Sequence, residues 1–509
     1  MKKSRLLLLL ATAAMGATAL TGCGETVDNG QVIILWTTFN DTYQTVINNA
    51  IASFKKAHPE YEVRNIKQNG SYDDLKNMAL KGAAGGDYPD LIAAYPDSVA
   101  DFINAGISCD ITKYMNDPEI GWTEDDINDV PKGYIDEGQN YAIPGTYSLP
   151  ICKSTEAMFY NRKILVDLDL SGINDEINNG QPLTDDYLQH LTWDELFDVL
   201  CPALMEYNES LPADKKILVP GADYQSNWAI VGYDSDDNLF ITLAEQYGYP
   251  YTSINQQTGK GSVDFVEKND DGTFKAVSDN YMNLMKKFSK AYANKYFTTK
   301  GVVGKNVNYV FTTGGMLFSI GSTGGVKYQY STNDAEHQDV GVAPIPQVDL
   351  DNPKTINQGP SIAFLSRGAS EEIMDKHAKG AWLLYKEWTS KAYATQWAMN
   401  TGYAPIRNSV ATSQEFINYS DESKQPDNSL EKLNAKTARY VASNIDSLFS
   451  SPVYTGSSKA RNGVSGIIAD IFKKAVLPTD PSAADYASKM KTYEDTVSEI
   501  FSKGYKNAI

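Results

Sequence analysis

Val32-Ile33-Ile34-Leu35-Trp36 (VIILW) is a continuous apolar run of strand length, with no polar residue alternating through it. Such a run is typical of a strand that is buried on both faces, as in a parallel sheet. A helix-spaced apolar series follows and ends before Pro59; its members are Tyr43, Val46, Ile47, Ala50, Ile51 and Phe54. Together they predict a strand followed by an amphipathic helix.

The next part of the chain repeats this alternation. Residues 61–66 and 89–94 predict two more strands, and residues 72–84 predict the helix between them. The opening third is therefore expected to be βαβαβ, an α/β domain.

The remainder of the chain is less regular. Thr192-Trp193-Asp194-Glu195-Leu196 has the form of a capping-box helix start within a second lobe, and residues 253–279 predict a polar hairpin or insertion. Residues 301–325 are β-like in composition, and a long helix across residues 381–388 introduces a mostly helical C-terminal region.

The N-terminus has the pattern of an export signal. Lys2, Lys3 and Arg5 precede an apolar run, residues 6–20, that is shorter than the ~20 residues needed to span a bilayer as a helix. Leu20-Thr21-Gly22-Cys23 then resembles the lipobox of bacterial lipoproteins, in which a peptidase cuts before a cysteine that receives the lipid. We expect a signal peptide over residues 1–22 and a lipidated tether over 23–30. The alternative is a soluble secreted protein in which Cys23 is incidental.

Composition excludes several classes of protein. The chain has 509 residues, 42% of them hydrophobic, so it can bury a large core in two or three domains. Its net charge of −19 argues against a nucleic-acid partner. Besides Cys23 there are Cys109, Cys152 and Cys201, an odd number without CxxC spacing, so we expect at most one disulfide and no zinc site.

No catalytic motif is found. The sequence lacks GxSxG, HExxH, GxxxxGK and a GxGxxG after a strand, and its four histidines are expected at the surface. Carboxylates are abundant, so a glycoside hydrolase that uses two of them stays open as an alternative. A calcium loop is a weaker alternative, because Leu239 stands where its sharp turn needs glycine; its ligands would be Asp234, Asp236, Asn238, Thr242 and Glu245.

Aromatic and small polar residues recur in the loops after strands, where open α/β sheets bind ligands. Sugars need aromatic platforms together with hydroxyl, amide and carboxylate partners, so this pattern points to a carbohydrate. For any single residue, core packing or a turn explains its presence as well as ligand contact does. The loops contain Trp36-Thr37-Thr38-Phe39-Asn40, Tyr95 and Asp97, Tyr147 and Ser148, and Ser322 and Thr323.

Six further stretches occur in a specific order: Phe54-Lys55-Lys56-Ala57-His58-Pro59, Tyr88-Pro89-Asp90-Leu91, PICKSTEAMFYN from Pro150 to Asn161, Gly314-Gly315-Met316 to Gly325, Gly359-Pro360-Ser361, and Thr401-Gly402-Tyr403-Ala404-Pro405. In this order the chain resembles the extracellular solute-binding proteins of ABC importers, which include maltose-binding and glycerol-3-phosphate-binding proteins. The resemblance runs nearly end to end.

The resemblance implies an α/β, two-lobed periplasmic-binding-protein-like fold (type II) that closes on its ligand at a hinge between the lobes. The N-lobe would comprise residues 30–147 and 308–355, and the C-lobe residues 152–303 and 360–509. It further implies a monomeric receptor, not an enzyme, without cofactor or metal. The receptor would be lipid-anchored at the extracellular face of the bacterial cytoplasmic membrane and would deliver a carbohydrate to ABC permease subunits.

The same resemblance implies the ligand contacts. They are Trp36, Thr38, Asn40, Tyr72, Tyr95, Asp97, Ser148, Ser154, Thr155, Trp228, Ser322, Thr323, Gly359, Tyr403 and Arg407. Several of these motifs look most like the glycerol-3-phosphate branch, so a phosphate ester is the alternative ligand, for which Lys153, Arg407 and Arg461 would be the available cations. Neutral oligosaccharides are the broader use of the family and are expected first.

Overall fold

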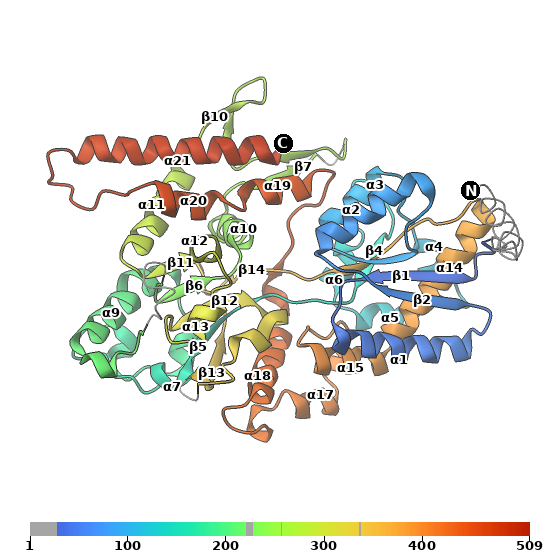
Figure 1. The fold of residues 1–509 in the computed structure, drawn as a ribbon, viewed down its shortest axis with the longest axis horizontal. Helices are drawn as coiled ribbons and strands as arrows, with labels where there is room; N and C mark the ends of the chain where they lie inside the picture. Colours follow the sequence, from blue (N-terminus) through green and yellow to red (C-terminus); the bar gives the residue numbers. More distant parts are fainter. Residues whose placement is uncertain (1–27, 220–227, 256, 335–336) are drawn as a thin grey trace, which may run out of the picture.

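Two five-stranded sheets organise the chain into two lobes that lie side by side in Figure 1. The computed structural model describes residues 28–219, 228–255, 257–334 and 337–509. The expected signal peptide, Cys23 and most of the tether lie outside the described residues. Each sheet is covered by helices, and each lobe has its own apolar core. The α/β, two-lobed expectation is confirmed.

The N-lobe begins with the predicted βαβαβ unit. Its elements are β1 (Val32–Thr37), α1 (Asp41–Ala57), β2 (Glu62–Lys67), α2 (Tyr72–Gly82) and β3 (Leu91–Ala94). The strands β2, β1 and β3 are parallel, so their carboxyl ends meet at one edge of the sheet. The sheet order is β2-β1-β3-β15-β4, with β4 at Ser148–Pro150 and β15 at Ser361–Phe364.

The C-lobe sheet has the order β11-β6-β12-β5-β13. Its strands are β5 (Glu156–Asn161), β6 (Val231–Tyr233), β11 (Phe297–Thr299), β12 (Phe318–Ser322) and β13 (Val340–Ala343). The strand β5 is buried along its whole length between antiparallel β12 and β13. The order of each sheet brings together segments that are far apart in the sequence.

This pairing corrects the expected lobe boundaries. Residues 308–355 were assigned to the N-lobe, but β12 and β13 pair with β5 in the C-lobe sheet. Residues 360–509 were assigned to the C-lobe, but β15 pairs with β3 and β4 in the N-lobe sheet. The helix α14 (Glu371–Trp388) then packs on α1. Both errors have one cause, since short apolar strands carry no local signal of which sheet they will join.

The predicted insertion is present as two antiparallel hairpins on the C-lobe. They consist of β7 (Thr252–Ile254) with β8 (Gly261–Val263), and β9 (Glu267–Lys268) with β10 (Phe274–Ala276). The final helix α21 (Tyr486–Ala508) lies beside them along the top of the C-lobe in Figure 1. The β-like prediction for residues 301–325 is only partly right, because two short helices precede β12; they are α12 (Lys300–Val303) and α13 (Asn308–Phe311).

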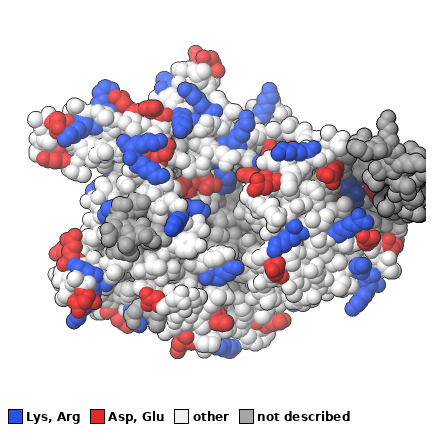
Figure 2. All heavy atoms as spheres, in the orientation of Figure 1, with Lys and Arg blue, Asp and Glu red and all other residues white. Residues whose placement is uncertain are grey.

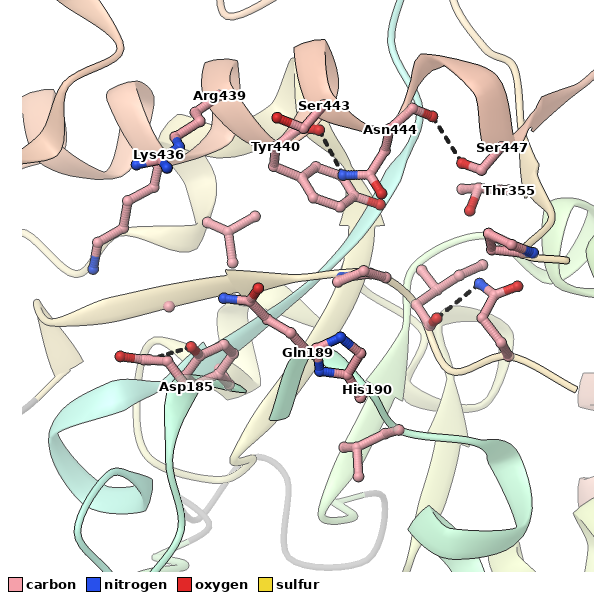
Figure 3. A pocket seen from close by; sticks show the side chains of 18 of the residues that line it. Asp185, Gln189, His190, Thr355, Lys436, Arg439, Tyr440, Ser443, Asn444 and Ser447 are labelled. Carbon is pink, nitrogen blue, oxygen red and sulfur yellow. Dashed lines mark hydrogen bonds between the residues drawn. The ribbon is translucent and has the colours of Figure 1, made fainter. Parts of the chain in front are cut away.

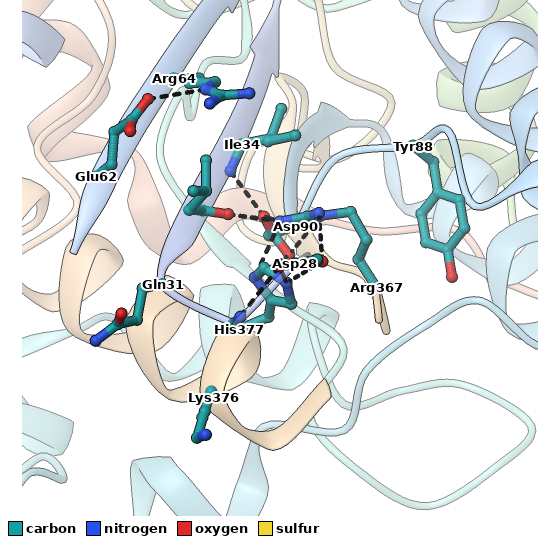
Figure 4. A network of polar contacts seen from close by, with 12 residues as sticks. Asp28, Gln31, Ile34, Glu62, Arg64, Tyr88, Asp90, Arg367, Lys376 and His377 are labelled. Carbon is teal, nitrogen blue, oxygen red and sulfur yellow. Dashed lines mark hydrogen bonds and ion pairs between the residues drawn. The ribbon is translucent and has the colours of Figure 1, made fainter. Parts of the chain in front are cut away.

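An ionic network that is partly buried fixes the first described residues to the N-lobe (Figure 4). His377 in α14 is fully buried, with Nε2 2.8 Å from an Asp28 oxygen and Nδ1 3.3 Å from Asp90. Arg367 joins both carboxylates, at 3.1 Å and 3.0 Å respectively. The expectation of a surface role is therefore wrong for His377. The chain from Asp28 onward is tied to the N-lobe core.

Three crossings connect the lobes. The first runs from β4 to β5, the second from β13 to β15 through β14 (Thr355–Ile356), and the third follows α17 (Gln414–Tyr419), after which α18 (Leu430–Ser443) packs on β13. The strand β14 pairs in parallel with β16 (Leu448–Phe449) at the C-lobe end of the hinge. No helix within the described ranges is long and apolar enough to cross a membrane.

Candidate ligand-binding site

A pocket of about 360 Å³ lies between the lobes at the hinge. The N-lobe supplies Tyr72, Tyr95 and Asp97 to its wall, and the C-lobe supplies Asp237 and Arg461. The second crossing forms its base with Ile356, Asn357, Gln358 and Gly359. Because both lobes and the hinge line it, the shape of this pocket depends on how far the lobes are closed.

The same local design positions the polar groups of each lobe. In the N-lobe β3 ends at Ala94, and Tyr95 and Asp97 follow at the start of α3 (Pro96–Asn104). In the C-lobe β6 ends at Tyr233, and Ser235 and Asp237 follow at the start of α10 (Asp236–Tyr247). The carboxyl ends of strands and the amino ends of helices therefore face the pocket from both sides, the usual ligand position in open α/β sheets.

Arg461 of α19 (Ser457–Val464) links the two lobes inside the pocket. Its Nη1 lies 2.9 Å from Asp237 Oδ2, and its Nε lies 3.3 Å from Asp97 Oδ2 in the opposite lobe. Burial disfavours the charged guanidinium, but these two carboxylates raise the pKa of Arg461 above its usual value. Arg461 therefore stays charged, and its charge is already matched by carboxylates.

The hinge contributes a second neutralised cation. Lys153 is fully buried, and its ammonium is ion-paired with Glu137, which is 5% exposed. Glu137 also accepts hydrogen bonds from Asn357 Nδ2 at 3.0 Å and from Ser361 Oγ at 3.1 Å. In the described part of the chain Asn357 Oδ1 is buried without a hydrogen-bond partner. A ligand hydroxyl in the pocket would satisfy this oxygen.

Two aromatic rings give the pocket an apolar face. Tyr72 and Tyr95 pack edge to face with ring centroids 5.2 Å apart, and Tyr95 is 38% exposed. The flat face of such a ring matches the C–H face of a sugar. The pocket thus combines aromatic surface with carboxylate, amide and hydroxyl groups.

Four predicted contacts line this pocket: Tyr72, Tyr95, Asp97 and Gly359. Four others meet one another at the first crossing, where Thr323 N donates to Thr155 O at 2.8 Å and Ser322 Oγ to Ser154 Oγ at 3.4 Å. These hydrogen bonds join the start of β5 to the end of β12. They place the four residues beside the hinge and outside the pocket lining.

Three of the remaining predicted contacts have structural partners. Asn40 caps α1 through Thr42 N, and Ser148 is fully buried, 3.0 Å from Tyr141 Oη. Arg407 is 4% exposed and pairs with Asp129 at 3.2 Å. Four residues are half-buried away from the pocket lining: Trp36 against the N-lobe core, Trp228 against the C-lobe core, Thr38, and Tyr403, whose ring lies 5.8 Å from that of Tyr43.

Asp237, Asn238 and Asn357 line the pocket but were not predicted to, and Arg461 was considered only as a cation for a phosphate. The signal for the first two was present, because they follow a strand just as Tyr95 and Asp97 do. The acidic spacing of this stretch instead suggested a calcium loop, in which Asn238 was a ligand and Asp237 was not. Asp236 accepts from Gly301 N at 2.8 Å and Asp234 from Val307 N at 2.8 Å, and the described residues contain no cluster placed to hold a metal.

A larger hollow of about 630 Å³ opens in the C-lobe between α18 and β13 (Figure 3). Lys436, Arg439 and Asn444 face Asp185, Gln189 and His190 across it. Its walls belong to elements packed on the C-lobe, so lobe closure does not enclose it. Because closure of the lobes does not enclose this hollow, the interlobe pocket is the better candidate site. On the face seen in Figure 2, Lys and Arg are interspersed with Asp and Glu.

The fold resembles that of several solved binding proteins. The GacH receptor of Streptomyces glaucescens, solved with acarbose, is 14% identical, with 93% of this chain and 97% of that chain covered and a TM-score of 0.59. UgpB from Mycobacterium tuberculosis, solved with glycerophosphocholine, is 15% identical over 93% and 99%, with a TM-score of 0.58. The cyclic alpha-maltosyl-1,6-maltose binding protein of Arthrobacter globiformis is 15% identical over 94% and 99%, with a TM-score of 0.58.

These identities are low and speak for the fold alone. No curated protein matches the chain. The family described as bacterial extracellular solute-binding protein, however, matches residues 49–422. The two lobes and the hinge crossings agree with the fold that the resemblance implied. The chain therefore belongs to the bacterial extracellular solute-binding proteins.

Proposed function

We propose that this protein is the lipid-anchored receptor of an ABC importer, that it captures a neutral carbohydrate in the interlobe pocket, and that it delivers the sugar to the membrane permease. The observation that carries the choice of ligand is the charge of the pocket wall. Four carboxylates line the pocket, and Arg461 is the single cation among its described lining residues; the acids are Asp73, Asp97, Glu137 and Asp237.

A phosphate ester is less compatible with this wall. A phosphate needs cations or free amide donors to offset the loss of water. Arg461 is already held by two carboxylates, Lys153 is buried against Glu137, and Arg407 is paired with Asp129 outside the pocket. Neutral hydroxyls can accept from Arg461 and donate to Asp97 and Asp237 without adding charge. This favours a sugar over glycerol 3-phosphate or a related phosphate ester.

Calorimetry separates these ligands. The mature protein is titrated with neutral mono- and oligosaccharides and, in parallel, with glycerol 3-phosphate and glycerophosphocholine. We expect one neutral sugar to bind at 1:1 stoichiometry and to be recovered unchanged. A free ligand at 100 times its Kd would stabilise the fold by about 2.7 kcal/mol, which a thermal shift detects. Binding of the phosphate compounds alone would contradict the choice of ligand.

The glycoside hydrolase is the alternative from another class. The family and the neighbouring folds are binding proteins. A hydrolase also needs one carboxyl kept protonated as a general acid. Asp237 is poorly suited, because its pKa is lowered. Burial alone would raise this pKa, but Arg461 together with hydrogen bonds from Ser235 and Asn238 outweighs burial. Product analysis after incubation with oligosaccharides tests this alternative, and turnover would establish it.

The anchor is a separate part of the proposal and rests on Cys23. Mass spectrometry of protein extracted from the membrane fraction should find the N-terminal residue of the mature chain to be a diacylglyceryl cysteine. Cys23→Ser should release the protein into the soluble fraction. A wild-type protein found free of lipid would instead support the soluble secreted alternative.

A further inference from the structure

A second hollow continues the interlobe pocket away from the hinge. It has a volume of about 670 Å³ and shares Ser458 and Asn462 with the ligand pocket. None of the second-crossing residues 355–360 lines it. The two hollows therefore follow one another along the cleft, the first at the hinge and the second beyond α19.

The outer hollow is also an interlobe space. The N-lobe provides Lys76 and Asn77 from α2, and the C-lobe provides β8, α19 and the end of α21. Lys76 Nζ donates to Ser458 Oγ at 3.1 Å, directly across the cleft. The turn between β7 and β8 reaches the N-lobe as well, because a Cβ on Gly259 would lie 2.9 Å from Ala142 Cβ. The inserted hairpin thus spans both lobes.

Tyr454 gives the outer hollow the features of a ligand site. Its ring lies against the backbone of Gly261, where an added Cβ would stand 1.9 Å from a ring carbon. The side chain is 5% exposed, and its hydroxyl is buried without a hydrogen-bond partner among the described residues. A buried hydroxyl without a partner is costly, and a ligand hydroxyl beside it would remove that cost.

Two lysines of the outer hollow are paired with carboxylates. Lys76 lies 3.3 Å from Asp73 and 3.5 Å from Asp101, and Lys268 lies 2.9 Å from Asp264. Lys459 Nζ donates to the main-chain oxygen of Ile509 at 3.4 Å. With Lys76 and Lys268 paired in this way, the hollow is suited to a neutral polyhydroxylated group, as the inner pocket is.

We propose that the outer hollow is a second sugar subsite, built by the β7–β8 insertion, α19 and the end of α21 against α2, so that the ligand is an oligosaccharide occupying both hollows. This rests on the function proposed above. A long ligand contacts both lobes in the inner pocket and again in the outer hollow. It therefore favours the closed arrangement of the lobes more strongly than a short ligand does.

The test is calorimetry of the mature protein with malto-, cello-, xylo- and galacto-oligosaccharides of two to six units. Within the series that binds, we expect Kd to fall at least tenfold from the disaccharide to the longer members. Asn77→Ala and Tyr454→Phe should each remove most of this gain while leaving the Kd of the disaccharide unchanged. Asn77 is an exposed helical residue, so Asn283→Ala on the exposed face of α11 (Asp279–Ala293) is the matched control.

Affinity that is independent of length, with no effect of Asn77→Ala or Tyr454→Phe, would overturn the second subsite and leave the proposed function intact. The absence of binding by any sugar of any length would overturn both. Loss of the disaccharide's affinity in Asn77→Ala, with the fold preserved by circular dichroism, would also overturn the subsite, because it would place this residue at the inner pocket.

Discussion

Arg461 in the C-lobe and Asp97 in the N-lobe form an ion pair across the ligand cleft, with Nε and Oδ2 3.3 Å apart. The pair joins the two lobes at the point where a ligand must lie. Asp237 holds the other side of the guanidinium at 2.9 Å. Arg461 is thus at once a link between the lobes and a hydrogen-bond donor in the pocket.

Arg461→Ala should weaken sugar binding at least tenfold, which corresponds to about 1.4 kcal/mol. The variant loses a donor and leaves two carboxylates uncompensated beside the ligand. Calorimetry measures the affinity, and small-angle scattering of the unliganded variant should show a more open average shape. Arg439→Ala, on an exposed part of α18, is the control and should bind like the wild type.

Arg407→Ala, in contrast, should lower the stability of the protein and leave its sugar affinity unchanged. Arg407 is 4% exposed, donates to Thr389 O, and lies 3.2 Å from Asp129. Removing it leaves a partly buried carboxylate unpaired, so the free energy of unfolding should fall by about 2–4 kcal/mol. Urea unfolding measures this change, and calorimetry at a temperature where the variant is folded should find Kd unchanged. A weaker Kd in a stable variant would restore Arg407 as a ligand contact.

Gly359→Ala should disturb the hinge. Gly359 has φ +94, and a Cβ there would stand 1.6 Å from Cys152 O on the neighbouring crossing. Both strain and clash oppose a side chain, so we expect a loss of about 2 kcal/mol or more in unfolding free energy. Thermal unfolding measures it. Gly133→Ala in α6 (Lys132–Glu137) has open space around the added carbon and should be neutral or slightly stabilising.

Glu156 should make stability depend on pH. It is 1% exposed, and burial, only partly offset by hydrogen bonds from Tyr233 and Asn238, raises its pKa from 4.5 to about 7. Between those two pH values the folded state binds a proton that the unfolded state has lost. The Glu156 contribution to stability is therefore full below pH 4.5 and falls as pH rises through 7, by on the order of 2–3 kcal/mol.

Urea unfolding at pH 5 and pH 8 measures this dependence. Glu156→Gln cannot ionise, so its loss of stability between the two pH values should be smaller than that of the wild type by the same amount. Glu371→Gln, at an exposed position in the first turn of α14, should behave like the wild type. Equal pH dependence in Glu156→Gln and the wild type would show that the buried carboxyl is not the source.

The sequence predicted the opening βαβαβ unit because its signals are local. Each signal depends on residues that are close together in the sequence: VIILW, the helix-spaced residues after Asn40, and the helix stop before Pro59. The observed bounds of β1 and α1 agree closely with these signals. Lobe membership could not be predicted in this way. The strand β15 joins β3 across more than two hundred and fifty residues, and its Ser-Ile-Ala-Phe sequence would suit either sheet.

The residues of the candidate site also divide into those with a local sequence signal and those that only the tertiary structure places. Tyr95 and Asp97 were found because they follow a strand, and the same reasoning would have found Asp237 after β6. Arg407 and Arg461 could not be distinguished from sequence, since both are cations in helical C-terminal segments. Only the tertiary arrangement places the first against Asp129 and the second between Asp97 and Asp237.

The network of Asp28, Arg367 and His377 has a mechanical consequence for an anchored receptor. Asp28 is secured to Arg367 and to His377 of α14, a helix that Figure 1 shows on the side of the N-lobe away from the C-lobe. If the lipid is on Cys23, the intervening chain can extend to at most about 17 Å. The N-lobe would then stay close to the bilayer, and the C-lobe would make most of the movement that opens and closes the cleft.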